Sequence, residues 1–134
     1  MDRELLISRL RTVLETSAPE LVFAYLFGSF ARGDQKDSSD VDLAVYYREP
    51  PRPSLNSPPA CLEADLVREL GREVQVIDLH RAPPDLVFRI LRDKVVLLDR
   101  DKSLRIRFEV RARNEFWDLE PILDIVRKKK RSSA

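Results

Sequence analysis

The chain has 134 residues, a length that fits one domain built around a single hydrophobic core. With 43% hydrophobic residues, 35% charged residues and a net charge of +1, it has no strong overall field toward nucleic acid or an anionic membrane. It has no run of roughly 18–20 apolar residues that could span a membrane, no signal peptide, and only one cysteine, so we expect a cytoplasmic protein without an internal disulfide.

The first third of the chain predicts a helix followed by two strands. Apolar residues recur at helical spacing between positions 6 and 14, and Pro19 ends that helix. Residues 21–27 are a short apolar run rich in β-forming residues, which is typical of a buried strand. A polar turn over residues 34–39 then leads into a second predicted strand over residues 41–47.

Residues 49–59 carry five prolines, and we expect this segment to be a surface loop that is neither a helix nor a central strand. The loop is too close to both ends of the chain to separate two domains, so we place it within one domain. After the loop the pattern predicts a helix, a strand, a second helix and a short edge strand, over residues 61–70, 74–79, 83–91 and 94–98.

The C-terminal part of the chain is predicted to be helical. From Ser103 onward, apolar residues repeat every three or four positions, which predicts one long amphipathic helix or two helices that meet at Pro121. The basic run Arg127–Arg131 opens a tail over residues 127–134 that is solvated unless it contacts RNA or an acidic partner. Strands that alternate with helices predict a single domain of the α/β or α+β class over residues 1–134.

Residues 28–43 combine a glycine turn with paired carboxylates. Gly28 and Ser29 follow the first strand, where backbone N–H groups, a hydroxyl and the close approach that glycine permits suit a triphosphate. Arg32 lies one helical turn further on, within reach of a phosphate. A glycine turn after a strand is common, so this half of the motif is a weak signal by itself.

Asp40 and Asp42 form the second half of the motif. They lie two positions apart at a predicted strand, so both side chains point to the same face. Two such carboxylates repel each other unless a cation lies between them, and oxygen ligands suit Mg²⁺, which in turn suits triphosphate chemistry. Asp78 ends a later strand and is the expected third carboxylate, which would allow two metal ions. An isolated Asp-x-Asp is more often an ordinary turn or strand end, so the interpretation depends on the whole motif.

The motif resembles the signature of the DNA polymerase β-like nucleotidyltransferase superfamily, and more narrowly that of its minimal nucleotidyltransferase (MNT) branch. The resemblance is carried by Gly28-Ser29, Ala31-Arg32-Gly33 and Ser39-Asp40-Val41-Asp42-Leu43. It implies the fold of that superfamily, a small mixed β-sheet flanked by helices. It also implies that Gly28 and Ser29 bind ATP, while Asp40, Asp42 and Asp78 are catalytic and bind two Mg²⁺ ions.

The resemblance further implies a partner. Minimal nucleotidyltransferases are typically encoded beside HEPN-domain RNases and act as antitoxins that transfer AMP from ATP to a tyrosine of the toxin. A chain this short has almost no room for its own acceptor domain, so we expect a heteromeric complex with a HEPN toxin, docked on the C-terminal helical part. We expect no membrane contact, and no nucleic-acid contact beyond the basic tail.

Two other classes of function remain open from the sequence. The first is an antitoxin without activity that neutralises its partner by binding alone. The intact Asp40, Asp42 and Asp78 argue against this class. The second is a nucleotidyltransferase for a small molecule such as an aminoglycoside, and the absence of a second substrate domain argues against that class.

Overall fold

A four-stranded mixed sheet forms the centre of the computed structural model, which describes residues 2–132 and, for Ser17 and residues 118–132, the backbone alone. The strand order is β3-β2-β1-β4. β1 is antiparallel to both of its neighbours, whereas β2 and β3 are parallel. The strands span Leu21–Phe27 (β1), Val41–Tyr47 (β2), Val74–Asp78 (β3) and Val95–Asp99 (β4).

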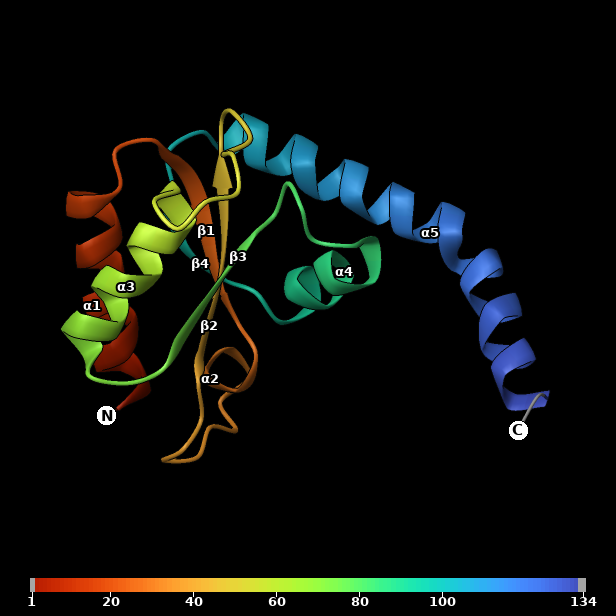
Figure 1. The fold of residues 1–134 in the computed structure, drawn as a ribbon, viewed down its shortest axis with the longest axis horizontal. Helices are drawn as coiled ribbons and strands as arrows, with labels where there is room; N and C mark the ends of the chain where they lie inside the picture. Colours follow the sequence, from red (N-terminus) through yellow and green to blue (C-terminus); the bar gives the residue numbers. More distant parts are fainter. Residues whose placement is uncertain (1, 133–134) are drawn as a thin grey trace.

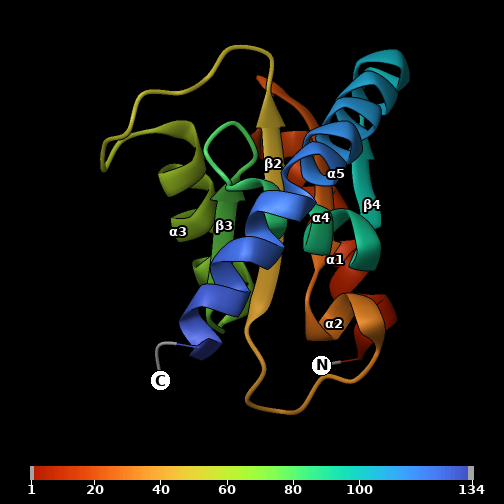
Figure 2. The same ribbon diagram turned by 90° about the vertical axis from the view of Figure 1, so that its right-hand side faces the viewer.

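Helices cover both faces of this sheet. Figure 1 shows α1 and α3 on one face and α4 on the other, while α5 crosses one end of the sheet and projects away from it. In the view turned by 90°, α4 and α5 lie in front of the strands (Figure 2). No helix in the described part of the chain is long and apolar enough to cross a membrane. The helices span Arg3–Ser17 (α1), Ser29–Arg32 (α2), Pro58–Leu70 (α3), Pro84–Asp93 (α4) and Lys102–Ser132 (α5).

The two faces of the sheet carry two separate apolar clusters. Alternate residues of β2 divide between them: Leu43 and Val45 pack toward α1 and α3, whereas Ala44 and Tyr46 pack toward α4 and α5. Because β1 and β2 are central and covered on both faces, their sequences are almost continuously apolar rather than alternating. The edge strand β3 is less covered and leaves Gln75 exposed.

The four predicted strands and the four predicted helices are found in the predicted order, with most ends within three residues, and the structure adds the short helix α2, which was not predicted. α3 begins at Pro58, three residues before the expected start, so Pro58 and Pro59 belong to a helix rather than to the loop. The first turn of a helix needs no backbone N–H donor, and proline is therefore compatible with it. α5 is one helix that continues through Pro121, and the side chains of the basic run 127–131 lie outside those that the structure describes.

A buried group of charges attaches α5 to the sheet. The Glu109 side chain of α5 is only 7% exposed, and its carboxylate accepts hydrogen bonds from Lys94 and Arg105. Arg105 also donates a bond of 2.8 Å to Asp99 at the end of β4. Removing one partner from such a buried pair leaves the remaining charges without compensation, which costs far more than the intact pair contributes.

We therefore predict that Glu109→Ala destabilises the fold. The free energy of unfolding should fall by about 3 kcal/mol, because Lys94 and Arg105 lose their shared carboxylate. Urea unfolding followed by circular dichroism measures this change. Glu115→Ala is the matched control on the exposed surface of the same helix, and it should change stability by less than about 0.5 kcal/mol. Equal losses in the two variants would contradict this account of α5.

Candidate active site

The turn at Gly28 and the start of β2 lie against each other. Phe27, the last residue of β1, pairs with Asp42 in the antiparallel ladder. Gly28 adopts a φ of 75°, and a Cβ atom at this position would lie 2.4 Å from Oδ2 of Asp42. The Asp42 carboxylate therefore occupies space that is free only because residue 28 has no side chain.

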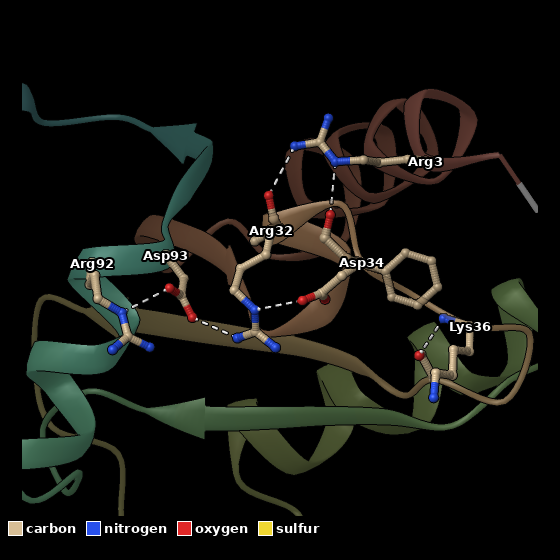
Figure 3. A network of polar contacts seen from close by, with 9 residues as sticks. Arg3, Arg32, Asp34, Lys36, Arg92 and Asp93 are labelled. Atoms are coloured by element: carbon tan, nitrogen blue, oxygen red, sulfur yellow. Dashed lines mark hydrogen bonds and ion pairs between the residues drawn. The ribbon is translucent and has the colours of Figure 1, made fainter.

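The short helix α2 is held in position by the apolar core and by hydrogen bonds from α1. Its residue Phe30 is buried in the cluster beneath α1 and α3. Arg3 of α1 donates hydrogen bonds from Nε to the Phe30 carbonyl at 2.8 Å and from Nη2 to the Ala31 carbonyl at 3.2 Å (Figure 3). These contacts satisfy carbonyl groups that a four-residue helix cannot bond itself. Ser29, the first residue of α2, is thereby fixed beside Asp42.

A cavity of about 350 Å³ opens between this turn and α4. Its volume lies within the range of small-molecule sites, roughly 300–1,000 Å³. One wall comes from the end of β1, α2 and β2, and the other from α4. The lining residues are Phe27, Gly28, Ser29, Arg32 and Asp42 on the first wall, and Leu86, Arg89, Arg92 and Asp93 on the second.

The two aspartates of the motif lie close enough to influence each other. Asp42 is partly buried, whereas Asp40 is exposed immediately before β2. Burial, and then the negative charge of Asp40, raise the pKa of Asp42, and the positive charge of Arg32 offsets part of this effect. Two neighbouring carboxylates, one of them set in a space that a Cβ atom would fill, fit a hard divalent cation such as Mg²⁺.

The structure does not bring Asp78 to this pair, contrary to the expectation from the sequence. Asp78 ends β3 as predicted, but it pairs with Val45, and Val45 packs toward α1 and α3, on the face of β2 opposite to Asp42. The backbone N–H of His80 donates to Oδ1 of Asp78 at 3.0 Å, and Arg81 lies 3.6 Å from Oδ2. Asp78 thus holds the turn after β3. Among the side chains that the structure describes, no three acidic, histidine or cysteine residues form a metal cluster.

Arg32 is engaged by two carboxylates at the rim of the cavity. Its guanidinium bonds Asp93 at 2.9 Å and Asp34 at 3.3 Å, and these hydrogen bonds raise its pKa (Figure 3). Arg92 bonds the other oxygen of Asp93 at 3.1 Å. Burial raises the pKa of Asp93, but the hydrogen bonds from Arg92 and Arg32 outweigh it, and the net pKa is lowered. Asp93 therefore links α2 to α4 across the cavity.

The basic wall formed by α4 is a part of the site that the motif did not predict. Arg89 is exposed at the cavity and makes no ion pair within residues 2–117, where side chains are described. Leu86, Arg89 and Arg92 recur every three residues and so share one face of the helix, while Val87 and Ile90 point into the core. This spacing was visible in the sequence, but nothing local indicated that α4 packs beside the Gly28 turn.

Comparison with known proteins now identifies this arrangement. The family described as polymerase beta, nucleotidyltransferase matches residues 9–103, which include every residue of the cavity. The chain belongs to this family. It is a nucleotidyltransferase, and its mixed sheet with flanking helices is the fold that the sequence predicted.

Individual proteins and solved structures are also similar to this chain. A protein of Methanocaldococcus jannaschii named as a protein adenylyltransferase is 37% identical over 75 residues, which are 56% of this chain and 77% of that protein. A chain in the crystal structure of a toxin–antitoxin pair with AMP-PNP superposes with a TM-score of 0.73 at 24% identity, covering 94% of this chain and 98% of that chain. A chain in the complex of a tri-AMPylated Shewanella oneidensis HEPN toxin with its MNT antitoxin gives 0.71 at 21%, covering 93% and 98%. At these identities the two structures support the fold.

We predict that Asp42→Asn stabilises the protein at neutral pH when divalent ions are removed. Because the folded-state pKa of Asp42 is raised, its contribution to stability falls as the pH rises from the ordinary Asp value toward the raised one. The advantage of the variant should therefore be present at pH 7 and disappear near pH 3.5. Urea unfolding in EDTA at both pH values measures it, with Asp37→Asn in the exposed loop as the control. A less stable variant at pH 7 would refute this electrostatic account.

A second prediction concerns Gly28→Ala. Gly28 and Gly33 both have positive φ angles, of 75° and 83°, but an added Cβ meets Asp42 only at Gly28 and meets nothing within 4 Å at Gly33. Gly33→Ala should thus cost about 1 kcal/mol of backbone strain in the left-handed helical region. Gly28→Ala should cost about 2–4 kcal/mol more, because a φ of 75° with a ψ of −156° is nearly restricted to glycine and because the added Cβ meets Asp42. Chemical unfolding measures both. Combining Gly28→Ala with Asp42→Ala should remove the part of the cost that comes from the Cβ contact and leave the backbone strain, so a cost equal to the sum of the two single variants would show that Asp42 is not the obstacle.

Proposed function

We propose that this chain is a Mg²⁺-dependent protein adenylyltransferase, which transfers AMP from ATP to a tyrosine of a HEPN-domain RNase and so inactivates it as an antitoxin. The observation that carries the proposal is the Asp40–Asp42 pair beside the Gly28–Ser29 turn, at a cavity with a basic opposite wall. Carboxylates on one side and arginines on the other match a metal-bound triphosphate.

The acceptor is inferred from the relatives. The Methanocaldococcus jannaschii protein is named for transfer to protein, and the Shewanella oneidensis complex holds a HEPN toxin that carries AMP groups. This chain has the fold of that complex's matching chain over 93% of its own length. A protein acceptor also agrees with the fold of the described residues, because elements from both ends of that fold line the nucleotide cavity and none of them forms a separate acceptor domain.

The first wall of the cavity would bind the metal ion and the phosphates, and the α4 wall would add a positive charge. Asp40 and Asp42 would hold the Mg²⁺ ion, which when bound neutralises phosphate charge and makes the acceptor hydroxyl more acidic. The turn at Gly28 and Ser29 offers a backbone that phosphate oxygens can approach closely. Arg89 faces the cavity from α4 and supplies a positive charge to the triphosphate.

The transfer itself exchanges one phosphorus–oxygen bond for another. The tyrosine oxygen forms a bond to the α-phosphorus of ATP, the bond from that phosphorus to the bridging oxygen breaks, and pyrophosphate leaves. The hydroxyl proton, with a pKa near 10 in free tyrosine, is released to solvent. Asp78 lies on the other face of the sheet, so it takes no part in this step.

An exposed apolar stripe on α5 offers a place for the partner to dock. Ile106, Val110 and Trp117 are 43%, 50% and 59% exposed. They lie four and seven residues apart, so they share one face of the helix, opposite to the face that carries the buried Phe108. Large apolar side chains aligned in this way are typical of surfaces that another protein covers. The stripe supports a protein partner and is also compatible with inhibition by binding alone.

Incubation of the purified toxin with this protein, ATP and Mg²⁺ tests the proposal. We predict that the toxin gains the mass of one or more AMP groups and stays inactive after this protein has been removed. Added phosphate charge beside an RNase site would repel the anionic substrate. Recovery of full RNase activity with an unchanged toxin mass would instead establish inhibition by binding alone. Transfer to an aminoglycoside but not to the toxin would establish the small-molecule alternative.

Variants assign the activity to the cavity. The Asp40→Ala, Asp42→Ala double variant should leave the toxin unmodified, because the proposed metal ligands are gone. Arg89→Ala should lower kcat/KM by about tenfold or more, the equivalent of one hydrogen bond to a charged group at roughly 1.5–3 kcal/mol. Arg68→Ala on α3 removes the same charge from the other side of the sheet, and it should leave the rate unchanged.

A further inference from the structure

The register of the two parallel strands identifies the residue that stands beside Asp42. In the β2–β3 ladder Asp42 pairs with Gln75. Paired residues on neighbouring strands point to the same face of a sheet, and Ile77, two positions beyond Gln75, packs on the α4 and α5 side. Gln75 is therefore on the face of the sheet that carries the Asp42 carboxylate, and it is exposed there.

Gln75 and Asp42 are close enough for their side chains to bind the same metal ion. Adjacent strands lie about 4.8 Å apart, so the Cβ atoms of Asp42 and Gln75 are separated by about 5 Å. The nearest carboxylate on β3, that of Asp78, is three residues further along the strand and on the opposite face. Gln75 thus occupies the position at which a third carboxylate would complete a cluster with Asp40 and Asp42.

We propose that Gln75 is the third side chain of the metal site and that, because it is neutral, the site holds a single tightly bound divalent ion. This inference rests on the proposed metal-dependent function and specifies its ion requirement. The number of charged ligands sets the affinity of an oxygen site for a divalent ion. Two ions about 4 Å apart repel each other strongly, and two carboxylates with a neutral amide offset less of that repulsion than three carboxylates do.

The amide of Gln75 can still contribute to the site in two ways. Its carbonyl oxygen is a neutral ligand for a hard cation, and its NH₂ group can donate to the Asp42 carboxylate or to a phosphate oxygen. It adds no third negative charge next to Asp42, whose burial already disfavours the charged form. The neutral side chain that weakens a second ion site therefore also spares the folded protein additional repulsion when no metal is present.

The test is to count the ions in the complex with a non-hydrolysable nucleotide. Mn²⁺ replaces Mg²⁺, AMP-PNP replaces ATP, and electron paramagnetic resonance measures free Mn²⁺ during titration. The wild type should bind about one tight ion per chain, and Gln75→Glu or Gln75→Asp should bind about two, with the second ion held about tenfold more tightly than in the wild type. Without metal, both variants should melt at a lower temperature than the wild type, and Mn²⁺ should raise their melting temperature more.

Two control variants separate this effect from a general change of charge. Asn56→Asp adds a negative charge in the exposed proline-rich loop, and Asp78→Asn removes one from the opposite face of β3; both should leave the ion count at about one. Two tight ions in the wild type, or an unchanged count in both Gln75 variants, would overturn the inference alone. Equal binding of Mn²⁺ and AMP-PNP by the wild type and by the Asp40→Ala, Asp42→Ala variant would overturn the proposed function, and the inference with it.

Discussion

The close approach of Gly28 to Asp42 is the constraint on which the site depends. The pairing of β1 with β2 places the end of one strand beside the start of the other, and the two meet at a distance that only glycine allows. Phe30 and Arg3 then fix α2 against this junction from the core and from α1. The carboxylate, the turn and the basic face of α4 line one cavity because this junction places Asp42 and Ser29 side by side, opposite α4.

The two faces of the sheet differ: one carries the connection between β2 and β3, and the other carries the cavity. The connection from β2 to the parallel strand β3 runs through the proline-rich loop and α3, which lie on the face away from the cavity (Figure 1). On that side Arg81 joins Asp78 to the carbonyl of Pro51, so the polar residues after β3 hold the loop in place. The other face is covered by α4 and the start of α5, and the cavity lies between α4 and the Gly28 turn.

The strands, and the position of Asp42 beside the Gly28 turn, could be predicted because they depend on neighbours along the chain. The strands are continuous apolar runs, and Gly28, Ser29, Asp40 and Asp42 belong to one short segment whose ends meet through a single hairpin-like pairing. The face on which a side chain of β3 lies is different, because it depends on the register between strands that are thirty residues apart. A shift by one residue reverses every side chain of a strand. Asp78 was therefore expected on the wrong face of the sheet, and the position of Arg89 at the cavity was not predicted.

The attachment of α5 has a consequence for how a partner would meet the nucleotide. Glu109 bonds Lys94 just before β4, and Trp117 lies eight residues further along the helix, about 12 Å away at 1.5 Å per residue. A protein seated on this stripe is held at a fixed distance from the cavity, so its acceptor group experiences a high effective concentration there, on the order of millimolar or more. Under the proposed function, recognition of the acceptor would be separated from catalysis: the helix would select the molecule, and the cavity would need little affinity of its own for a single hydroxyl.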